Sequence, residues 1–235
     1  MTRVIKKADE RRAEILDAAQ RLFMSRGYDA TTVYDLITVV GISKGAFYHH
    51  FSSKDEVLHA LVWRAAEQGL AAVSPLFERE DITPLEKLKA FFKDKQQYKK
   101  ENSTALRSII KVLFREENLR LRLQSAEQMT EIIVPHLGRV LEEGAKRGEF
   151  DIEDPEETAR LVLNLGSTLH EAFAVALKVA ESRKAEAILL LRRRADSCER
   201  AIERLLGVPK HSLSIVDPEL IELFLAPSPG KGANR

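Results

Sequence analysis

The stretch TTVYDLITVVGISKGAFYHHFSSKD, residues 31–55, decides the fold. Thr32 is followed three positions later by an acidic residue, the pattern of a capping box, which predicts a short helix through Val40. Gly41 ends this helix, and Ser43 caps a second short helix that we expect over residues 44–49. Two short helices joined by a glycine turn have the spacing of a helix-turn-helix.

The second short helix begins with small residues. Residues 43–46 would let its backbone sink into a DNA major groove about 12 Å wide. Phe47 and Phe51 lie four positions apart, so they share one face and can anchor the helix on its neighbours. Tyr48 and His49 must then point away from that anchor, toward solvent or a phosphate backbone.

The rest of the chain also favours helices, and no segment has convincing strand alternation. The first helix is expected from about Asp9 to Arg26, with an apolar face of Ile15, Ala18, Ala19, Leu22 and Phe23. Ser74-Pro75 marks the end of a connecting helix over 54–72, and Pro135 predicts a kink or break. The further helices are expected over 84–100, 103–114, 117–146, 155–180, 184–206 and 218–225. The fold class is therefore all-α.

Composition narrows the function classes. The 235 residues are 44% hydrophobic and 31% charged, with a single cysteine, Cys198. No apolar run reaches the length of about 18 residues that a membrane span needs, and the N-terminus lacks a secretory signal. We expect a cytoplasmic chain without disulfides. Net charge is only +1, but residues 1–12 form a basic arm that includes Arg3, Lys6 and Lys7.

At the helix-turn-helix the sequence resembles the TetR family of bacterial transcriptional regulators. The resemblance covers about 50 residues and is carried by Ile15-Leu16, Ala18-Ala19, Leu22-Phe23, Gly27-Tyr28, Thr31-Thr32-Val33, Gly41-Ile42-Ser43-Lys44-Gly45, Phe47-Tyr48-His49-His50-Phe51 and Lys54. It implies a DNA-binding domain over 1–53, a helical ligand-binding and dimerisation domain over 54–225, and a disordered tail over 226–235. Ile37 and Val40 depart from the family's usual alanines, which puts the fine packing of the two short helices in question.

The resemblance also implies roles for single residues. Ser43, Lys44, Gly45 and Ala46 would face the bases, and Lys44 would reach a guanine edge. Tyr48 and His49 would contact phosphates, as would Thr32 and Lys54 at helix N-termini, and the basic arm would follow the backbone or enter a minor groove. Plainer interpretations stay open: Thr32 as a cap only, Lys44 in solvent, Tyr48 in packing, His50 as an internal residue and the arm as a disordered segment.

In the second domain the resemblance implies a homodimer through the helices at 155–180 and 184–206. Their apolar stripes would pack on the partner, or else only bury core within the chain: Ala159, Val162, Leu163, Leu169, Ala172 and Ala176, then Ile188, Leu191, Ala195, Ile202 and Leu205. A small effector would bind among Phe92, Tyr98, Phe114, Met129, His136, Asn164, His170 and Phe173, residues that could equally be plain core.

The expected function is a ligand-responsive regulator, a repressor that a small molecule releases from palindromic operator DNA. Activation in place of repression stays open. The six histidines form no zinc motif, and phosphate-loop, nucleophile-elbow and dinucleotide motifs are missing, so we expect no enzyme, metal or cofactor. The alternative is a helical interaction adaptor that does not bind DNA.

Overall fold

A computed structural model describes residues 8–226 of the chain, without the side chains of Ala72, Val73 and Ala105. The chain divides into two compact units between Ala65 and Ala66. The first holds α1 (Ala8–Ser25), α2 (Val33–Val40), α3 (Lys44–His50) and the start of α4 (Lys54–Phe77). The second holds the rest of α4 and α5 (Pro84–Glu101), α6 (Ser103–Leu113), the 3-10 turn η1 (Glu116–Asn118), α7 (Leu119–Lys146), α8 (Pro155–Val179), α9 (Lys184–Leu206) and α10 (Pro218–Phe224).

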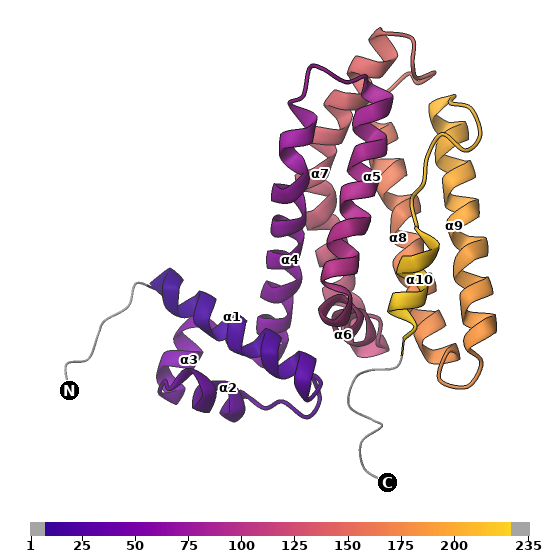
Figure 1. Cartoon of the computed structure of the whole chain (residues 1–235). Helices are drawn as coiled ribbons and strands as arrows, with labels where there is room; N and C mark the ends of the chain where they lie inside the picture. Colours follow the sequence, from indigo (N-terminus) through magenta and orange to yellow (C-terminus); the bar gives the residue numbers. More distant parts are fainter. Residues whose placement is uncertain (1–7, 227–235) are drawn as a thin grey trace. The chain divides into compact units, whose positions relative to one another are not determined.

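The expected all-α class is confirmed, since the described residues form helices and contain no strand (Figure 1). One helix end was predicted wrongly. α4 continues past Ser74-Pro75 to Phe77. Proline cannot bond the carbonyl four residues back, but the Ser74 hydroxyl donates to that carbonyl, Ala71 O, over 3.3 Å. α7 likewise runs unbroken through Pro135, which lies on its exposed side.

The core of the first unit joins α1 to the helices that follow. Ile15, Ala18 and Ala19 are fully buried, as the apolar face of the first helix predicted, and Leu22 and Phe23 are almost so. Leu36 of α2 and Val57 of α4 complete this core without exposed surface. Because the start of α4 packs here, the first compact unit extends to Ala65 and includes part of the connecting helix.

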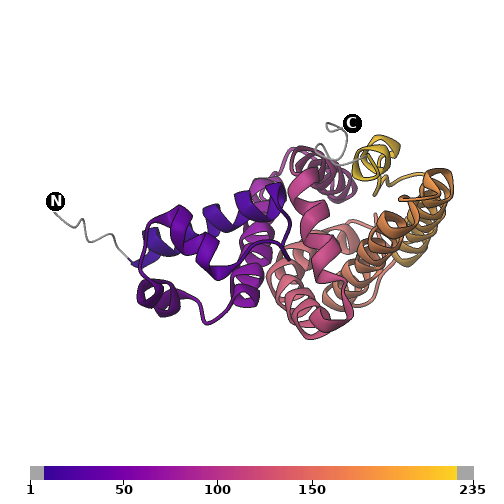
Figure 2. The ribbon, with the colours of Figure 1, turned by 90° about the horizontal axis from the view of Figure 1, so that it is seen from below.

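The second unit is a helical bundle in which α8 packs against α7 on one side and α9 on the other (Figures 1 and 2). The segment that follows α9 folds back and is hydrogen-bonded to two carboxylates of α9, the buried Glu203 and the half-buried Glu199. Glu203 accepts a hydrogen bond from the Leu213 N–H, and Glu199 accepts one from the Ile215 N–H. Among residues 8–226, no helix is long and apolar enough to cross a bilayer.

The apolar stripes of α8 and α9 mainly bury core within the chain. Ala159, Val162, Leu169, Ala172, Ala176, Leu191, Ala195 and Ile202 are all buried, and Leu163, Ile188 and Leu205 are half-buried. The plainer of the two interpretations of these stripes is therefore the one that the structure supports. The large apolar residues exposed on these helices are different ones, namely Leu161, Val175 and Leu189.

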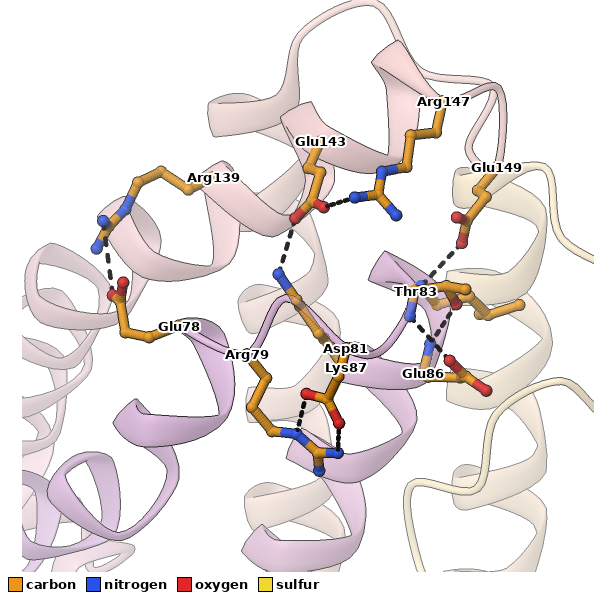
Figure 3. A network of polar contacts seen from close by, with 11 residues as sticks. Glu78, Arg79, Asp81, Thr83, Glu86, Lys87, Arg139, Glu143, Arg147 and Glu149 are labelled. Carbon is orange, nitrogen blue, oxygen red and sulfur yellow. Dashed lines mark hydrogen bonds and ion pairs between the residues drawn. The ribbon is translucent and has the colours of Figure 1, made fainter.

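A polar network fixes the connection between α4 and α5 against α7 (Figure 3). Thr83 and Glu86 form a capping box at the start of α5, as the sequence predicted. Lys87, almost fully buried, donates to Glu143 over 2.8 Å, and Glu143 also pairs with Arg147 over 2.6 Å. The Lys87 ammonium holds the pKa of the Glu143 carboxyl below its usual value. A buried lysine is tolerated here because a carboxylate compensates its charge.

Candidate nucleic-acid interface

The helix α3 is anchored from one side, as its phenylalanine spacing predicted. Phe47 and Phe51 are 0% and 1% exposed, and their ring centroids lie 6.2 Å apart. Ser43 caps the helix by accepting the Ala46 N–H over 3.1 Å. Gly41 ends α2 with a φ of 70°, a left-handed conformation that glycine adopts without strain. The two short helices therefore meet in the expected helix-turn-helix.

The opposite edge of α3 is open to solvent. Ser43, Lys44 and Gly45 are exposed and Ala46 is half-buried. Gly45 has an ordinary helical φ, and a Cβ atom built on it meets nothing within 4 Å. Neither backbone conformation nor packing within the unit thus requires glycine here, although glycine destabilises a helix by about 0.5–1 kcal/mol relative to alanine. A close approach by another molecule would account for the missing side chain.

Lys44 and Tyr48 lie together on this open edge. The Lys44 ammonium is 5.9 Å from the centroid of the Tyr48 ring, and that ring meets Phe47 edge to face at 5.4 Å. Tyr48 is 47% exposed, and its hydroxyl has no hydrogen-bond partner among the described residues. Packing accounts for the ring, whereas the hydroxyl and the ammonium are available to an external acceptor. Contact of either group with DNA stays a prediction.

Thr32 acts as a cap in the structure. Its hydroxyl donates to Asp35 Oδ2 over 2.6 Å and accepts the Asp35 N–H over 3.1 Å. The Thr32 hydroxyl first, and then the Thr32 backbone N–H, which also donates to Asp35 Oδ2 over 2.8 Å, lower the pKa of Asp35. The Asp35 carboxylate thus lies at the N-terminus of α2. Contact of Thr32 with a phosphate stays a prediction.

The Lys54 side chain is also used within the unit. Its ammonium donates to the carbonyls of Tyr28 and Thr31 over 2.9 and 3.0 Å, and lies 4.1 Å from the Tyr28 ring centroid. The Tyr28 hydroxyl in turn donates to Asp55. Lys54 therefore ties the turn between α1 and α2 to the start of α4. The expected contact of Lys54 with a phosphate stays a prediction.

The two histidines of α3 differ in their surroundings. His49 is exposed, as a phosphate contact requires, whereas His50 is half-buried. Burial, and then the charges of His49, Arg11 and Arg12, hold the pKa of His50 below its usual value. The basic residues Arg3, Lys6 and Lys7 of the N-terminal arm lie outside the described residues.

Tyr34 is a candidate that the sequence reasoning missed. It is 75% exposed, the most exposed of the large apolar or aromatic residues of the described chain. In α2 the inward-facing residues are Val33, Leu36 and Ile37, and Tyr34 lies on a different face of the helix. This helical spacing was the sequence signal that could have identified Tyr34 as an exposed aromatic residue. Ile37 and Val40, the two departures from the family pattern, are half-buried.

The expected effector residues do not all gather in one place. Phe92 and Phe173 are buried, and Tyr98, Phe114, Met129, His136 and His170 are half-buried. His136 stacks on Phe77 with centroids 5.8 Å apart. Asn164 is exposed on α8, so it does not line the interior of the unit as expected. Within residues 8–226, no group of three or more His, Cys, Asp or Glu side chains could hold a metal ion.

Comparison with known proteins places the helix-turn-helix in a family. The family model of bacterial regulatory proteins, tetR family, matches residues 15–61. This range contains most of α1, all of α2 and α3, and the start of α4.

Curated relatives extend the similarity beyond this range. An HTH-type transcriptional regulator of Bacillus subtilis, YfiR, is 27% identical over 67% of this chain and 77% of its own. The HTH-type transcriptional repressor KstR2 of Mycobacterium tuberculosis is 29% identical over 65% of this chain and 78% of its own.

Solved structures share the fold. A TetR-family transcriptional regulator from Pectobacterium atrosepticum superposes with a TM-score of 0.65 at 19% identity, covering 89% of this chain and all of that one. A second, from Syntrophomonas wolfei, has a TM-score of 0.58 at 22% identity, covering 82% of this chain and 96% of that one.

Proposed function

The chain belongs to the TetR family of bacterial transcriptional regulators, and from this premise we propose that it represses transcription as a homodimer on palindromic operator DNA until a small effector releases it. The observation that carries this proposal is the open edge of α3. Ser43, Lys44 and Gly45 are exposed there beside Tyr48. Neither packing nor backbone conformation within the first unit requires a glycine at position 45.

On DNA, we infer that the N-terminal residues of α3 face the bases. Lys44 is the long donor of this edge and suits a guanine O6/N7 acceptor pair. Tyr48, His49 and Tyr34 are exposed and would donate to phosphates on either side. Lys54 and Thr32 would contribute by holding α2 and α3 in place.

Dimerisation is proposed through the outer faces of α8 and α9. Leu161, Asn164 and Val175 lie on an exposed face of α8, and Leu189 is exposed on α9. A two-fold axis between copies would present two α3 helices to half-sites about 34 Å apart. Effector binding in the second unit would act through α4, the one helix common to both units.

A mobility-shift assay on the DNA upstream of the chain's own gene tests the proposal. Binding should weaken steeply as salt rises, because phosphate contacts release counterions. Lys44→Ala should change the preferred base, whereas Tyr48→Phe should lower affinity for all sequences. Lys89→Ala, which removes an exposed charge of α5, is the control and should bind like the parent. An adaptor without DNA binding would show no salt-sensitive shift, and that result would overturn the proposal.

A further inference from the structure

Three basic side chains gather inside the second unit. Lys95 and Lys99 lie one turn apart on α5, so they share a face, and His170 lies on α8. The charges of both lysines contribute to the low pKa of His170, and the charge of Lys95 contributes to that of Lys99. The three groups are therefore close in space although they come from two helices.

The three side chains have no acidic partner. Within residues 8–226, none of them forms an ion pair, which contrasts with the buried Lys87 and its partner Glu143. Burial first, and the neighbouring Lys95 second, lower the pKa of Lys99 to about 7. Burial also lowers the pKa of Lys95 and takes that of His170 well below its usual value. The three side chains are half-buried, and cations that are partly removed from water are normally paired with a carboxylate.

Open space and an aromatic ring lie next to the cluster. Gly166 stands one turn before His170 on the same face of α8, and a Cβ atom built on it meets nothing within 4 Å. Lys95, Lys99 and His170 all keep some accessible surface in spite of their desolvated surroundings. The Lys95 ammonium lies 5.5 Å from the centroid of the Phe91 ring, and Phe173 follows His170 by one turn. The basic groups therefore lie beside the Phe91 ring and near the open space at Gly166.

We propose that Lys95, Lys99 and His170 form an anion-binding site in which the effector places a carboxylate or phosphate group, with its apolar part beside Phe91 and Phe173. The inference rests on the proposed function only for its regulatory consequence. An anion at the cluster favours the charged forms of all three groups. Binding near pH 7 must therefore be accompanied by proton uptake, chiefly by Lys99 and His170.

Four probes of one chain length test the ligand class on the full chain without DNA. Decanoate and decyl phosphate carry the anion, decanol is neutral and decylamine is cationic. Isothermal titration calorimetry should show binding of at least one anionic probe, with decanol and decylamine at least tenfold weaker. The ratio of the two anionic affinities distinguishes a carboxylate ligand from a phosphate ligand. Titrations in two buffers of different ionisation enthalpy should show proton uptake at pH 7.

Matched variants assign the effect to the cluster. Lys99→Gln and His170→Gln should each weaken the anionic probe at least tenfold, and Lys99→Gln should reduce the proton uptake. Gly166→Leu should fill the open space next to Gly166 and abolish binding. Lys93→Gln, at an exposed position of the same helix, is the control and should bind like the parent. Since Lys99→Gln removes a desolvated charge, its thermal midpoint should not fall, so lost binding would not reflect unfolding.

Several outcomes would overturn the inference: no binding of either anionic probe, equal binding of decanol, or unchanged affinity in Lys99→Gln. A mobility shift separates this failure from failure of the proposed function. If DNA is bound but no anion binds, the anion site is wrong and the regulator stands. If decanoate binds but does not release DNA, the site stands and the proposed release mechanism is wrong.

Discussion

Replacing Gly45 with alanine should move stability and DNA binding in opposite directions. The new methyl group meets no atom of the chain within 4 Å, and the backbone φ is ordinary, so the folded unit bears no steric cost. Alanine should stabilise the helix by about 0.5 kcal/mol, the lower end of the usual range, because Gly45 lies in the first turn of α3. The thermal midpoint should rise by about 1–3 °C.

The same methyl group should weaken binding to DNA. If the α3 backbone approaches the duplex at Gly45, the added carbon pushes the helix outward and lengthens its hydrogen bonds beyond their normal range. One good base contact contributes about 1–3 kcal/mol, so its loss should lower affinity roughly 10- to 100-fold. Fluorescence anisotropy with an operator fragment at fixed salt measures this change, and thermal unfolding measures the stability.

Gly138→Ala is the matched control. Gly138 lies within α7, where a built Cβ atom makes only ordinary contacts at 3.6 Å or more. This variant should bind DNA like the parent. The reasoning is refuted if Gly45→Ala binds DNA as tightly as the parent, or if it lowers the thermal midpoint.

Further substitutions probe three other parts of the chain. Lys54→Gln should lower the thermal midpoint as well as DNA affinity, since the ammonium bonds two carbonyls of the first unit; a loss of affinity with unchanged stability would instead indicate a phosphate contact. Glu143→Gln should cost about 1–3 kcal/mol in urea unfolding, because it leaves buried Lys87 without its partner, and Lys87→Met should cost less; the reverse order would contradict the compensation of charge described above. Lys99→Met should remove a pH dependence of stability. The folded pKa of Lys99, about 7, lies below its unfolded value, so between about pH 7 and 10 the unfolded state binds the extra proton and stability rises with pH by about 1.4 kcal/mol per unit. Lys95 and His170 titrate beside it, so urea unfolding of parent and variant must be compared over this pH range; equal slopes would refute the prediction.

The fold followed from local sequence signals to a large degree. Capping residues such as Thr32, Ser43 and Thr83 fixed helix starts that the structure reproduces, because a cap bonds backbone groups only a few residues away. The prediction failed at Pro75, where proline was expected to end α4. A neighbouring serine hydroxyl compensates for the missing donor, and such a substitute cannot be inferred from proline alone.

What the sequence by itself determined was the helix-turn-helix and its exposed edge, since both depend on spacings within one short stretch. Only the tertiary structure decided how polar side chains are used. Lys54 and Thr32 suit a phosphate by their position at helix starts, yet Tyr28, Thr31 and Asp35 occupy them. The cluster of Lys95, Lys99 and His170 was equally hidden. The two lysines lie on α5 and His170 lies far along the chain on α8. The pKa values of Lys99 and His170 shift only because folding removes them from water and brings the charges together.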